Sequence, residues 1–365
     1  MGVPEKIKKI EEDLLRTQVN KKTEHHVGLL RAKLAKLKAE QEEQQSRKSG
    51  GGKGYDVKKS GDATVVLIGL PSVGKSTLLN RLTNAKSKVA SYAFTTLEVV
   101  PGLMEYKGAR IQILDLPGII LGASSGRGLG KRVLAVARHA DLVLFMVDVF
   151  QPEARALLEK ELRNTGIRVD QRRPNVVVET TSAGGIAVSV QGRMTEMSEA
   201  LIKDMLRVYD VSSARVFVRE DITPDQLIDV LAGNRTYVPS LTVMNKIDLV
   251  NAGFTNELAR KLPFKFVPIS AEGDVNIAAL REEIYRKLDF VRIYMRRRTG
   301  ETDFEEPMIV KNGSTVLEVC NKVHRAMKDD FRYAQIWGKS VKFGGQKVGM
   351  THRLMDEDVI TLVTK

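Results

Sequence analysis

The stretch Gly69-Leu70-Pro71-Ser72-Val73-Gly74-Lys75-Ser76 decides the fold of this chain. It fits the phosphate-binding pattern G-x-x-x-x-G-K-[ST], and it lies between a β-branched, apolar run at 64–68 and a helical pattern at 76–83. Glycines in the loop allow successive backbone N–H groups to converge on phosphate oxygens at a helix N-terminus, where the helix dipole also favours an anion. The strand, the loop and the helix together predict a P-loop nucleotide-binding fold.

The residue types of the loop predict separate roles. We expect Lys75 to reach the β- and γ-phosphates as a catalytic group, and the Ser76 hydroxyl to bind Mg²⁺. A glycine-rich turn with a solvated lysine is the alternative, and the strand–helix context disfavours it. The loop residues predicted to contact the nucleotide are Gly69, Pro71, Ser72, Val73, Gly74, Lys75, Ser76 and Thr77.

A second motif, Asp115-Leu116-Pro117-Gly118, ends the predicted strand 109–114. A carboxylate at that position can hold the Mg²⁺ shell through water, so Asp115 is a candidate metal residue. The amide of Gly118 can bind the γ-phosphate and sense its loss, which makes Gly118 a candidate catalytic and nucleotide-binding residue. Asp-x-x-Gly alone is a common pattern, but its position at the end of a strand favours the interpretation as a metal- and phosphate-binding motif.

Two further motifs follow apolar strands and predict recognition of the base. Asn245-Lys246-Ile247-Asp248 closes the run 241–244, and Ser270-Ala271-Glu272 follows the run 266–269. The Asp248 carboxylate can accept hydrogen bonds from N1–H and the exocyclic amine of guanine, which adenine cannot supply. Backbone amides at 270–272 could contact the base oxygen. Each motif alone could be an ordinary turn, but their order at strand ends predicts guanine-nucleotide binding by Asn245, Lys246, Asp248, Ser270, Ala271 and Glu272.

Alternating strand and helix patterns predict an α/β fold with a doubly wound, mostly parallel sheet and the ligand at the carboxyl ends of its strands. We expect the GTPase domain to comprise 61–169 and 238–290. The stretch 170–237 interrupts the alternation, so it predicts a small inserted αβ domain. Within it, apolar strands at 176–180 and 186–190 flank a glycine-rich turn and predict a β-hairpin.

The sequence outside the GTPase domain and its insert predicts a helical hairpin, a linker and a C-terminal domain. Residues 1–48 show leucines and isoleucines at helical spacing and predict a basic helical hairpin, either a solvated face or an RNA-facing arm. The glycine-rich stretch 49–60 predicts a flexible linker. Residues 291–365 contain the basic run Arg296-Arg297-Arg298, and after it short strand patterns, a helical pattern at 316–327 and an apolar ending at 358–363. This composition predicts a small β-rich domain.

Composition sets the limits for these assignments. The 365 residues are 42% hydrophobic and 28% charged, which excludes a largely disordered chain, a fibrous repeat and a pure coiled coil. No apolar run approaches the roughly 18 residues of a membrane span, and the single cysteine, Cys320, fits a reducing compartment. The net charge of +13 favours polyanions such as RNA. We therefore expect a cytoplasmic protein that uses neither a membrane nor DNA.

Further stretches of the sequence resemble motifs of a known protein family. Ala93-Phe94-Thr95-Thr96-Leu97 resembles the first switch of the Obg-related branch of the translation-factor-class GTPases, which implies Thr96 as a catalytic residue and Mg²⁺ ligand. The glycine-rich stretch 122–130 resembles that branch's second switch. Gly61-Asp62-Ala63-Thr64-Val65, Thr23-Glu24-His25-His26, the stretch 336–341 and the ending 356–360 resemble the developmentally regulated GTP-binding proteins of archaea and eukaryotes.

This resemblance extends over essentially the whole chain. It implies a ribosomal-protein-S5-like insert and a C-terminal β-grasp TGS domain. It also implies a molecular switch that hydrolyses bound GTP to GDP and phosphate with Mg²⁺. The implied partner is the ribosome or RNA, and a dedicated protein partner is a further possibility that the resemblance leaves open. An RNA-binding adaptor and an ATPase remain alternatives; one Obg-related subgroup prefers ATP, but it departs from Asn-Lys-x-Asp, which this sequence keeps.

The residue after Gly118 suggests how hydrolysis is assisted. Many regulatory GTPases carry glutamine there, whereas this chain has Ile119, which cannot hydrogen-bond the attacking water. Relatives with a hydrophobic residue at that position often use a monovalent cation, commonly held by an asparagine at the fourth loop position. This chain has Ser72 there, whose hydroxyl is still a suitable ligand for K⁺. We therefore predict that K⁺ stimulates hydrolysis more than Na⁺ does, with Ser72 and a carbonyl of the first switch as ligands. The alternative is that Ser72 caps the loop and a partner supplies the missing group.

Overall fold

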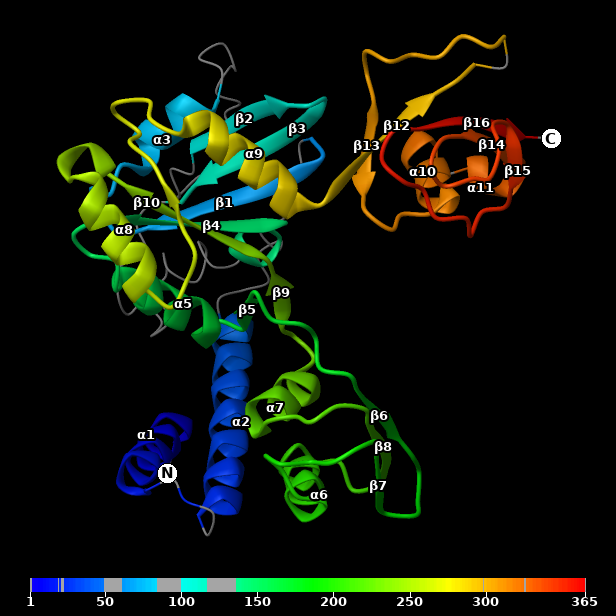
Figure 1. Cartoon of the computed structure of the whole chain (residues 1–365). Helices are drawn as coiled ribbons and strands as arrows, with labels where there is room; N and C mark the ends of the chain where they lie inside the picture. The colour runs from blue at the N-terminus through cyan, green and yellow to red at the C-terminus, as the bar shows by residue number, and fades with distance from the viewer. Residues whose placement is uncertain are drawn as a thin grey trace. The chain divides into compact units, whose positions relative to one another are not determined.

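The computed structural model describes residues 2–18, 20, 23–48, 61–83, 100–116, 136–297, 299–324 and 326–364. The chain divides into two compact units, Met1–Gly54 with Gly166–Tyr237, and Tyr55–Thr165 with Val238–Lys365 (Figure 1). The predicted linker at 49–60 lies outside the described residues. None of the described helices is long and apolar enough to cross a membrane.

The larger unit contains a six-stranded sheet with the order β11-β10-β4-β1-β3-β2. Neighbouring strands are parallel except for β2, which pairs antiparallel with β3. This sheet confirms the predicted doubly wound, mostly parallel fold. Its strands are β1 (Ala63–Gly69), β2 (Val100–Tyr106), β3 (Ala109–Asp115), β4 (Leu142–Asp148), β10 (Ser240–Asn245) and β11 (Val267–Pro268).

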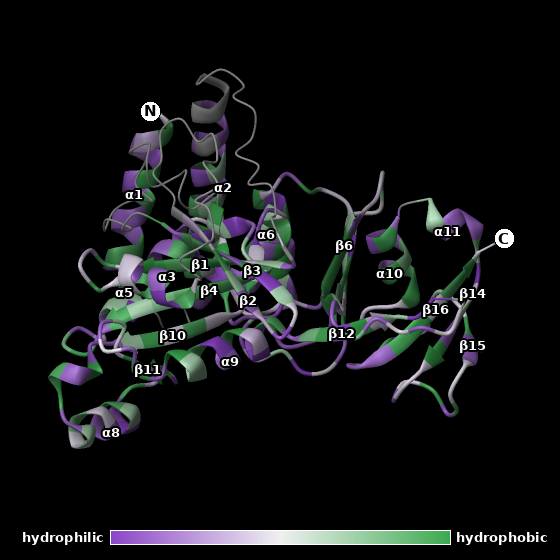
Figure 2. Ribbon diagram, turned by 90° about the horizontal axis from the view of Figure 1, so that it is seen from above, coloured by the Kyte–Doolittle hydropathy of each residue, from purple (hydrophilic) through white to green (hydrophobic). Residues whose placement is uncertain are grey.

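The central strands are buried because helices cover them. All seven residues of β1 are buried, and hydrophobic residues concentrate along the central strands in Figure 2. Continuous apolar strands of this kind need cover on both faces. On α3 the buried residues Leu78, Leu79 and Leu82 belong to the same apolar core as β1. The described helices of this part include α3 (Lys75–Leu82), α5 (Ala154–Asn164), α8 (Ala252–Lys261) and α9 (Ile277–Leu288).

The smaller unit joins the N-terminal hairpin to the insert. The two predicted helices are confirmed as α1 (Val3–Arg16) and α2 (Glu24–Lys48), and α2 contacts both α6 (Glu199–Val208) and α7 (Pro224–Ala232). Ala32 of α2 is fully buried in the apolar cluster of the insert. The sequence separates 1–48 from 170–237, whereas the structure places α2 of this hairpin against the core of the insert.

The predicted hairpin within the insert is wrong. The sheet order is β6-β8-β7, so β8 (Ala214–Val218) lies between β6 (Val176–Thr180) and β7 (Ile186–Val190). β8 pairs antiparallel with β6 and parallel with β7. Its alternating buried residues make it the most buried of the three strands, so it takes the centre and leaves two less buried strands at the edges.

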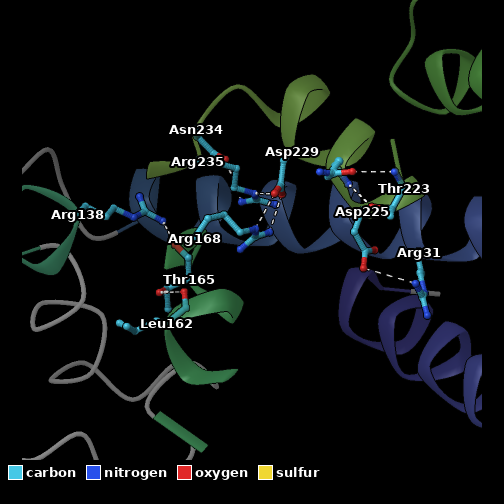
Figure 3. Close-up of polar contacts among 11 residues, drawn as sticks. Arg31, Arg138, Leu162, Thr165, Arg168, Thr223, Asp225, Asp229, Asn234 and Arg235 are labelled. Atoms are coloured by element: carbon cyan, nitrogen blue, oxygen red, sulfur yellow. Dashed lines mark hydrogen bonds and ion pairs between the residues drawn. The ribbon is translucent and has the colours of Figure 1, made fainter. Parts of the chain in front are cut away.

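A charged cluster fixes the start and end of the insert. β5 (Ile167–Val169) pairs with β9 (Thr236–Val238). Asp229, whose side chain is 4% exposed, accepts hydrogen bonds from Arg168 at 2.6 Å and from Arg235 at 3.0 Å (Figure 3). Two guanidinium groups on one buried carboxylate compensate its loss of hydration. The same view shows Arg31 of α2 paired with Asp225 of α7.

The C-terminal residues form a five-stranded sheet with the order β13-β12-β16-β14-β15. The predicted helix 316–327 is too long: α10 (Val316–Val323) ends where His324 adopts an extended backbone, and α11 (Met327–Asp330) follows. Cys320 of α10 is fully buried and belongs to the apolar core of this domain. The strands are β12 (Phe290–Met295), β13 (Met308–Lys311), β14 (Phe331–Trp337), β15 (Gln346–Val348) and β16 (Asp358–Thr364).

Candidate nucleotide-binding site

Four strands of the six-stranded sheet end at one edge and carry the predicted motifs there. The register places Asp115 of β3 opposite Leu67, two residues before the loop that follows β1. It also places Asn245 of β10 opposite Asp148 of β4. Motifs that are far apart in sequence therefore meet at the carboxyl edge of the sheet, where open α/β folds bind their ligands.

The loop between β1 and α3 has the backbone that its glycines predict. Gly74 caps α3 in the left-handed region, with φ 96°. A Cβ at Gly74 would lie 2.6 Å from Nδ2 of Asn245, so a larger residue does not fit without moving that side chain. Ser72 is also left-handed, with φ 62°, and is exposed. The loop thus brings its backbone amides to the N-terminus of α3, where an anion is favoured.

Lys75 lies folded against its own loop. Its Nζ donates hydrogen bonds to the carbonyl oxygens of Gly69, at 3.0 Å, and Leu70, at 2.9 Å. Burial lowers the pKa of Lys75, and the nearby Asp115 carboxylate opposes that shift. Two neutral carbonyl oxygens therefore hold the ammonium inside the loop. A negatively charged phosphate oxygen binds an ammonium more strongly than a carbonyl oxygen does, so a bound phosphate would draw Lys75 away from them.

Ser76 and Asp115 form a small set of hard oxygen ligands. The Ser76 hydroxyl donates to Oδ2 of Asp115 at 2.8 Å. Oδ1 of Asp115 is buried and has no hydrogen-bond partner among the described residues. Burial raises the pKa of Asp115, although the Ser76 hydroxyl and Lys75 act in the opposite direction. An unpartnered buried carboxylate oxygen beside a hydroxyl fits a water-bearing Mg²⁺ ion, which prefers oxygen ligands.

Asn245 joins the loop to the base-reading segments. It is buried, and its Nδ2 donates to the carbonyl of Val73 at 2.8 Å. Its Oδ1 accepts the N–H of Ala271 at 2.9 Å. One amide thus links the end of β1, the end of β10 and the segment after β11, which fixes the separation between any bound phosphates and the base.

The remaining predicted base-reading residues lie around this amide. Asp248 lies on a short 3₁₀ helix, Ile247–Leu249, and is exposed. Lys246 is left-handed, with φ 67°. Ser270 is fully buried, and its Oγ accepts the N–H of Gly273 at 2.9 Å, which shapes the turn that carries Ala271 and the exposed Glu272.

Two predicted catalytic residues, Thr96 and Gly118, lie outside the described residues, as do the rest of both switch segments and Ile119. The sequence also gave no signal for two residues that the structure brings into the site. Arg81 of α3 donates to the carbonyls of Ala271, at 3.1 Å, and Glu272, at 2.9 Å. Asp148 pairs with Lys246 at 2.5 Å. Neither belongs to a short motif, so only the fold could reveal them.

Three family descriptions match successive parts of the chain. Residues 64–181 match a family described as 50S ribosome-binding GTPase. Residues 183–290 match the C-terminal region that accompanies that domain. Residues 291–364 match the TGS domain. The third match agrees with the expected C-terminal TGS domain.

Curated relatives match from end to end. An uncharacterized GTP-binding protein of Methanocaldococcus jannaschii is 51% identical over 100% of this chain and 94% of the relative. The developmentally-regulated GTP-binding protein 2 of Homo sapiens is 46% identical over 100% of both chains. Among solved structures, the YchF GTPase of Schizosaccharomyces pombe has a TM-score of 0.45 at 11% identity and covers 84% of this chain and 99% of its own. Era of Aquifex aeolicus has a TM-score of 0.35 at 21% identity, covering 76% and 72%.

Proposed function

Because this chain belongs to the family of developmentally regulated GTP-binding proteins and is a GTPase of that family, we propose that it binds Mg²⁺·GTP at the carboxyl edge of the six-stranded sheet and hydrolyses it to GDP and phosphate. The observation that carries the proposal is the Asn245 amide, which bonds the phosphate-binding loop on one side and the segment of Ala271 on the other. A loop for phosphates alone would not require that link.

The phosphates are held by the loop 69–77 in this proposal. Its backbone amides bind their oxygens, and Lys75 exchanges the carbonyls of Gly69 and Leu70 for the β- and γ-phosphates. Gly118 contacts the γ-phosphate through its amide. Release of phosphate removes that contact, so the segments around Thr96 and Gly118 act as the parts of a switch.

The metal is held by Ser76 and Thr96, with Asp115 binding through water. The free Oδ1 of Asp115 supports this assignment, since a water ligand of the metal would satisfy it. When bound, Mg²⁺ neutralises charge on the β- and γ-phosphates. The hydroxyls of this chain orient the ion, and the buried carboxylate holds its water.

Guanine is read by Asp248, with Asn245, Lys246 and the amides of 270–272 forming the rest of the pocket. The exposed Asp248 carboxylate supports this role because it can face a ligand. Adenine has no N1–H and carries its amine at C6 rather than at C2, so a carboxylate that accepts from both N1–H and a C2 amine favours GTP, and the intact Asn-Lys-x-Asp motif supplies that carboxylate.

The direct test is release of phosphate from GTP by the purified chain. We expect turnover that falls on the order of a hundredfold in Lys75→Ala, as when one preorganised donor is removed from a charged transition state. Excess ATP should not compete. Phosphate release that is equal in both proteins would favour the nucleotide-supported adaptor, and competition by ATP would favour the ATPase.

We further propose that K⁺ assists hydrolysis with Ser72 as a ligand. The exposed hydroxyl of Ser72 and its left-handed backbone at the loop support a ligand position facing the phosphates. Ile119 supports the need for such an ion, because its side chain cannot orient water.

The ribosome or another RNA is the proposed partner, and the cytoplasm the proposed setting. The charge of +13 supports a polyanionic partner. So do four lysines, Lys6, Lys9, Lys33 and Lys36, which line a groove of about 420 Å³ on the smaller unit together with one acidic and three apolar residues. The matched family's description, 50S ribosome-binding GTPase, agrees with this setting.

A further inference from the structure

We propose that Asp148 is a positioning residue for base recognition: its carboxylate holds the ammonium of Lys246 and thereby leaves the Asp248 carboxylate free to read guanine. The inference rests on the proposed guanine-nucleotide function. It assigns a role to a residue that belongs to none of the nucleotide-binding motifs.

Asp148 is itself held in one orientation. It is the last residue of β4, and the parallel register places it opposite Asn245. Its Oδ1 accepts the N–H of Phe150 at 2.8 Å, and its Oδ2 lies 2.5 Å from Nζ of Lys246. Its side chain is only 12% exposed. Because both oxygens are engaged, the carboxylate presents a fixed acceptor to Lys246.

Lys246 is turned toward that acceptor by its backbone. Its φ of 67° lies in the left-handed region, which a residue with a side chain adopts when its surroundings impose it. Asn245 is bonded twice on the preceding side, and the N–H of Ile247 donates to Ile269 at 3.2 Å on the following side. The ammonium therefore lies over the end of β4, with its side chain 33% exposed.

Asp248 is the group that this arrangement protects. It is exposed, and its carboxylate makes no hydrogen bond or ion pair with any residue in the described part of the chain. Lys246 is only two residues away, and its four-carbon stem is long enough to bring an ammonium to that carboxylate. A charged donor binds a carboxylate more strongly than the neutral N–H groups of guanine do. A released Lys246 would thus compete with the base.

The competition makes a specific prediction for paired variants. Asp148→Asn keeps an oxygen acceptor for Phe150 but removes the charge that holds Lys246. We expect the dissociation constant for GDP to rise about three- to tenfold, the range expected when one long side chain loses its preorganised position. Lys246→Met keeps the apolar stem and removes the competing ammonium, so Asp148→Asn should have no further effect in that background.

The experiment measures GDP binding by calorimetry to the full chain, to Asp148→Asn, to Lys246→Met and to the double variant. Asp141→Asn is the matched control, since Asp141 precedes the other end of β4 and accepts the N–H of Thr64 at 2.9 Å. It should bind GDP as the unsubstituted chain does. Circular dichroism checks folding, and Asp148→Ser replaces Asp148→Asn if the latter does not fold.

Each outcome of this experiment either supports or contradicts the positioning role of Asp148. An Asp148→Asn effect that disappears beside Lys246→Met supports the inference. An effect of equal size in both backgrounds means that Asp148 only supports the turn at Phe150, and no effect at all equally overturns the role. Failure of the unsubstituted chain to prefer GDP over ADP would instead remove the proposed function itself.

Discussion

At the scale of single residues, the site is defined by polar groups that the sheet edge buries beside one another. Asn245 and Ser270 are buried and hydrogen-bonded to the turns around them, and they fix those turns. Lys75 and Asp115 are also buried, yet their strongest possible partners, phosphate and metal, come from a ligand. Groups of the first kind give the site its shape, while those of the second kind give it its affinity.

The monovalent cation is the first prediction at this scale. If K⁺ binds at Ser72, steady-state GTP turnover should be faster in KCl than in NaCl at matched ionic strength, because the larger ion suits the loop's oxygen ligands. Ser72→Ala should lose most of the difference between the two salts. Equal rates in both salts for the unsubstituted chain would contradict the cation proposal and favour a partner that supplies the missing charge.

A second residue-scale prediction concerns the acid sensitivity of the C-terminal domain. The guanidinium of Arg292, at 2.6 Å, lowers the pKa of Asp356. A lowered pKa means that the ion pair contributes stability above the ordinary value near 3.8, and that this contribution is lost as the pH falls through the folded-state pKa. Asp356→Asn should therefore unfold at lower urea than the unsubstituted chain at pH 7, and the difference should shrink toward pH 3.

Fluorescence of Trp337 provides the readout for that prediction. It is the only tryptophan of the chain, and it lies on β14 with the guanidinium of Arg296 at 4.4 Å from its ring. The exposed Asp329 supplies the control variant Asp329→Asn, which should follow the unsubstituted chain at every pH. A difference for Asp356→Asn that grows on acidification would show that the ion pair does not stabilise this domain.

At the scale of elements, short-range patterns predict strands and helices well and pairings less well. The strand at 64–68 and the helix after the loop are evident because apolar spacing and the Gly-Lys-Ser signal coincide. The apparent hairpin at 176–190 fails because its central strand, β8, comes 24 residues after β7 in the chain. The Arg81 and Asp148 contacts escape prediction for the same reason: spacing reveals motifs but not which distant side chains meet.

The packing of α2 into the insert makes a prediction at the same scale. Ala32 is fully buried against the insert, whereas Ala39 of the same helix is exposed. Ala32→Leu should overpack that core and lower the free energy of unfolding by about 1–3 kcal/mol. Ala39→Leu should change it by less than about 0.5 kcal/mol. Urea unfolding followed by circular dichroism measures both; equal effects would mean that α2 does not belong to the insert's core.

At the scale of the whole molecule, basic charge and nucleotide chemistry belong to different parts of one chain. The lysine-lined groove belongs to the smaller unit, and the nucleotide motifs belong to the larger one. Deleting the hairpin would expose the core around Ala32, so it would not test the charge alone. Substituting individual lysines leaves the fold intact and separates the two functions.

The salt dependence of RNA binding tests the basic groove. Replacing Lys6, Lys9 and Lys33 with alanine should reduce the slope of log affinity against log salt by about two, since each neutralised phosphate contributes roughly 0.7–0.9. Filter binding to a mixed-sequence RNA measures that slope, and GDP affinity should not change. Alanine at the exposed Lys261, Lys265 and Lys328 changes the net charge equally and should leave the slope nearly intact. If both triple variants behave alike, the groove has no special part in RNA binding.

The central claim, that this chain is a guanine-specific nucleotide-binding enzyme, is tested most directly by exchanging the base that Asp248 reads. Asp248→Asn replaces one acceptor with a donor that faces the exocyclic amine of guanine. Sites that read a base by hydrogen bonds discriminate on the order of 10⁴-fold, so titration with labelled nucleotides should show GTP affinity collapsing while xanthosine triphosphate becomes a ligand. Unchanged GTP binding in Asp248→Asn, with no gain for xanthosine triphosphate, would contradict the claim.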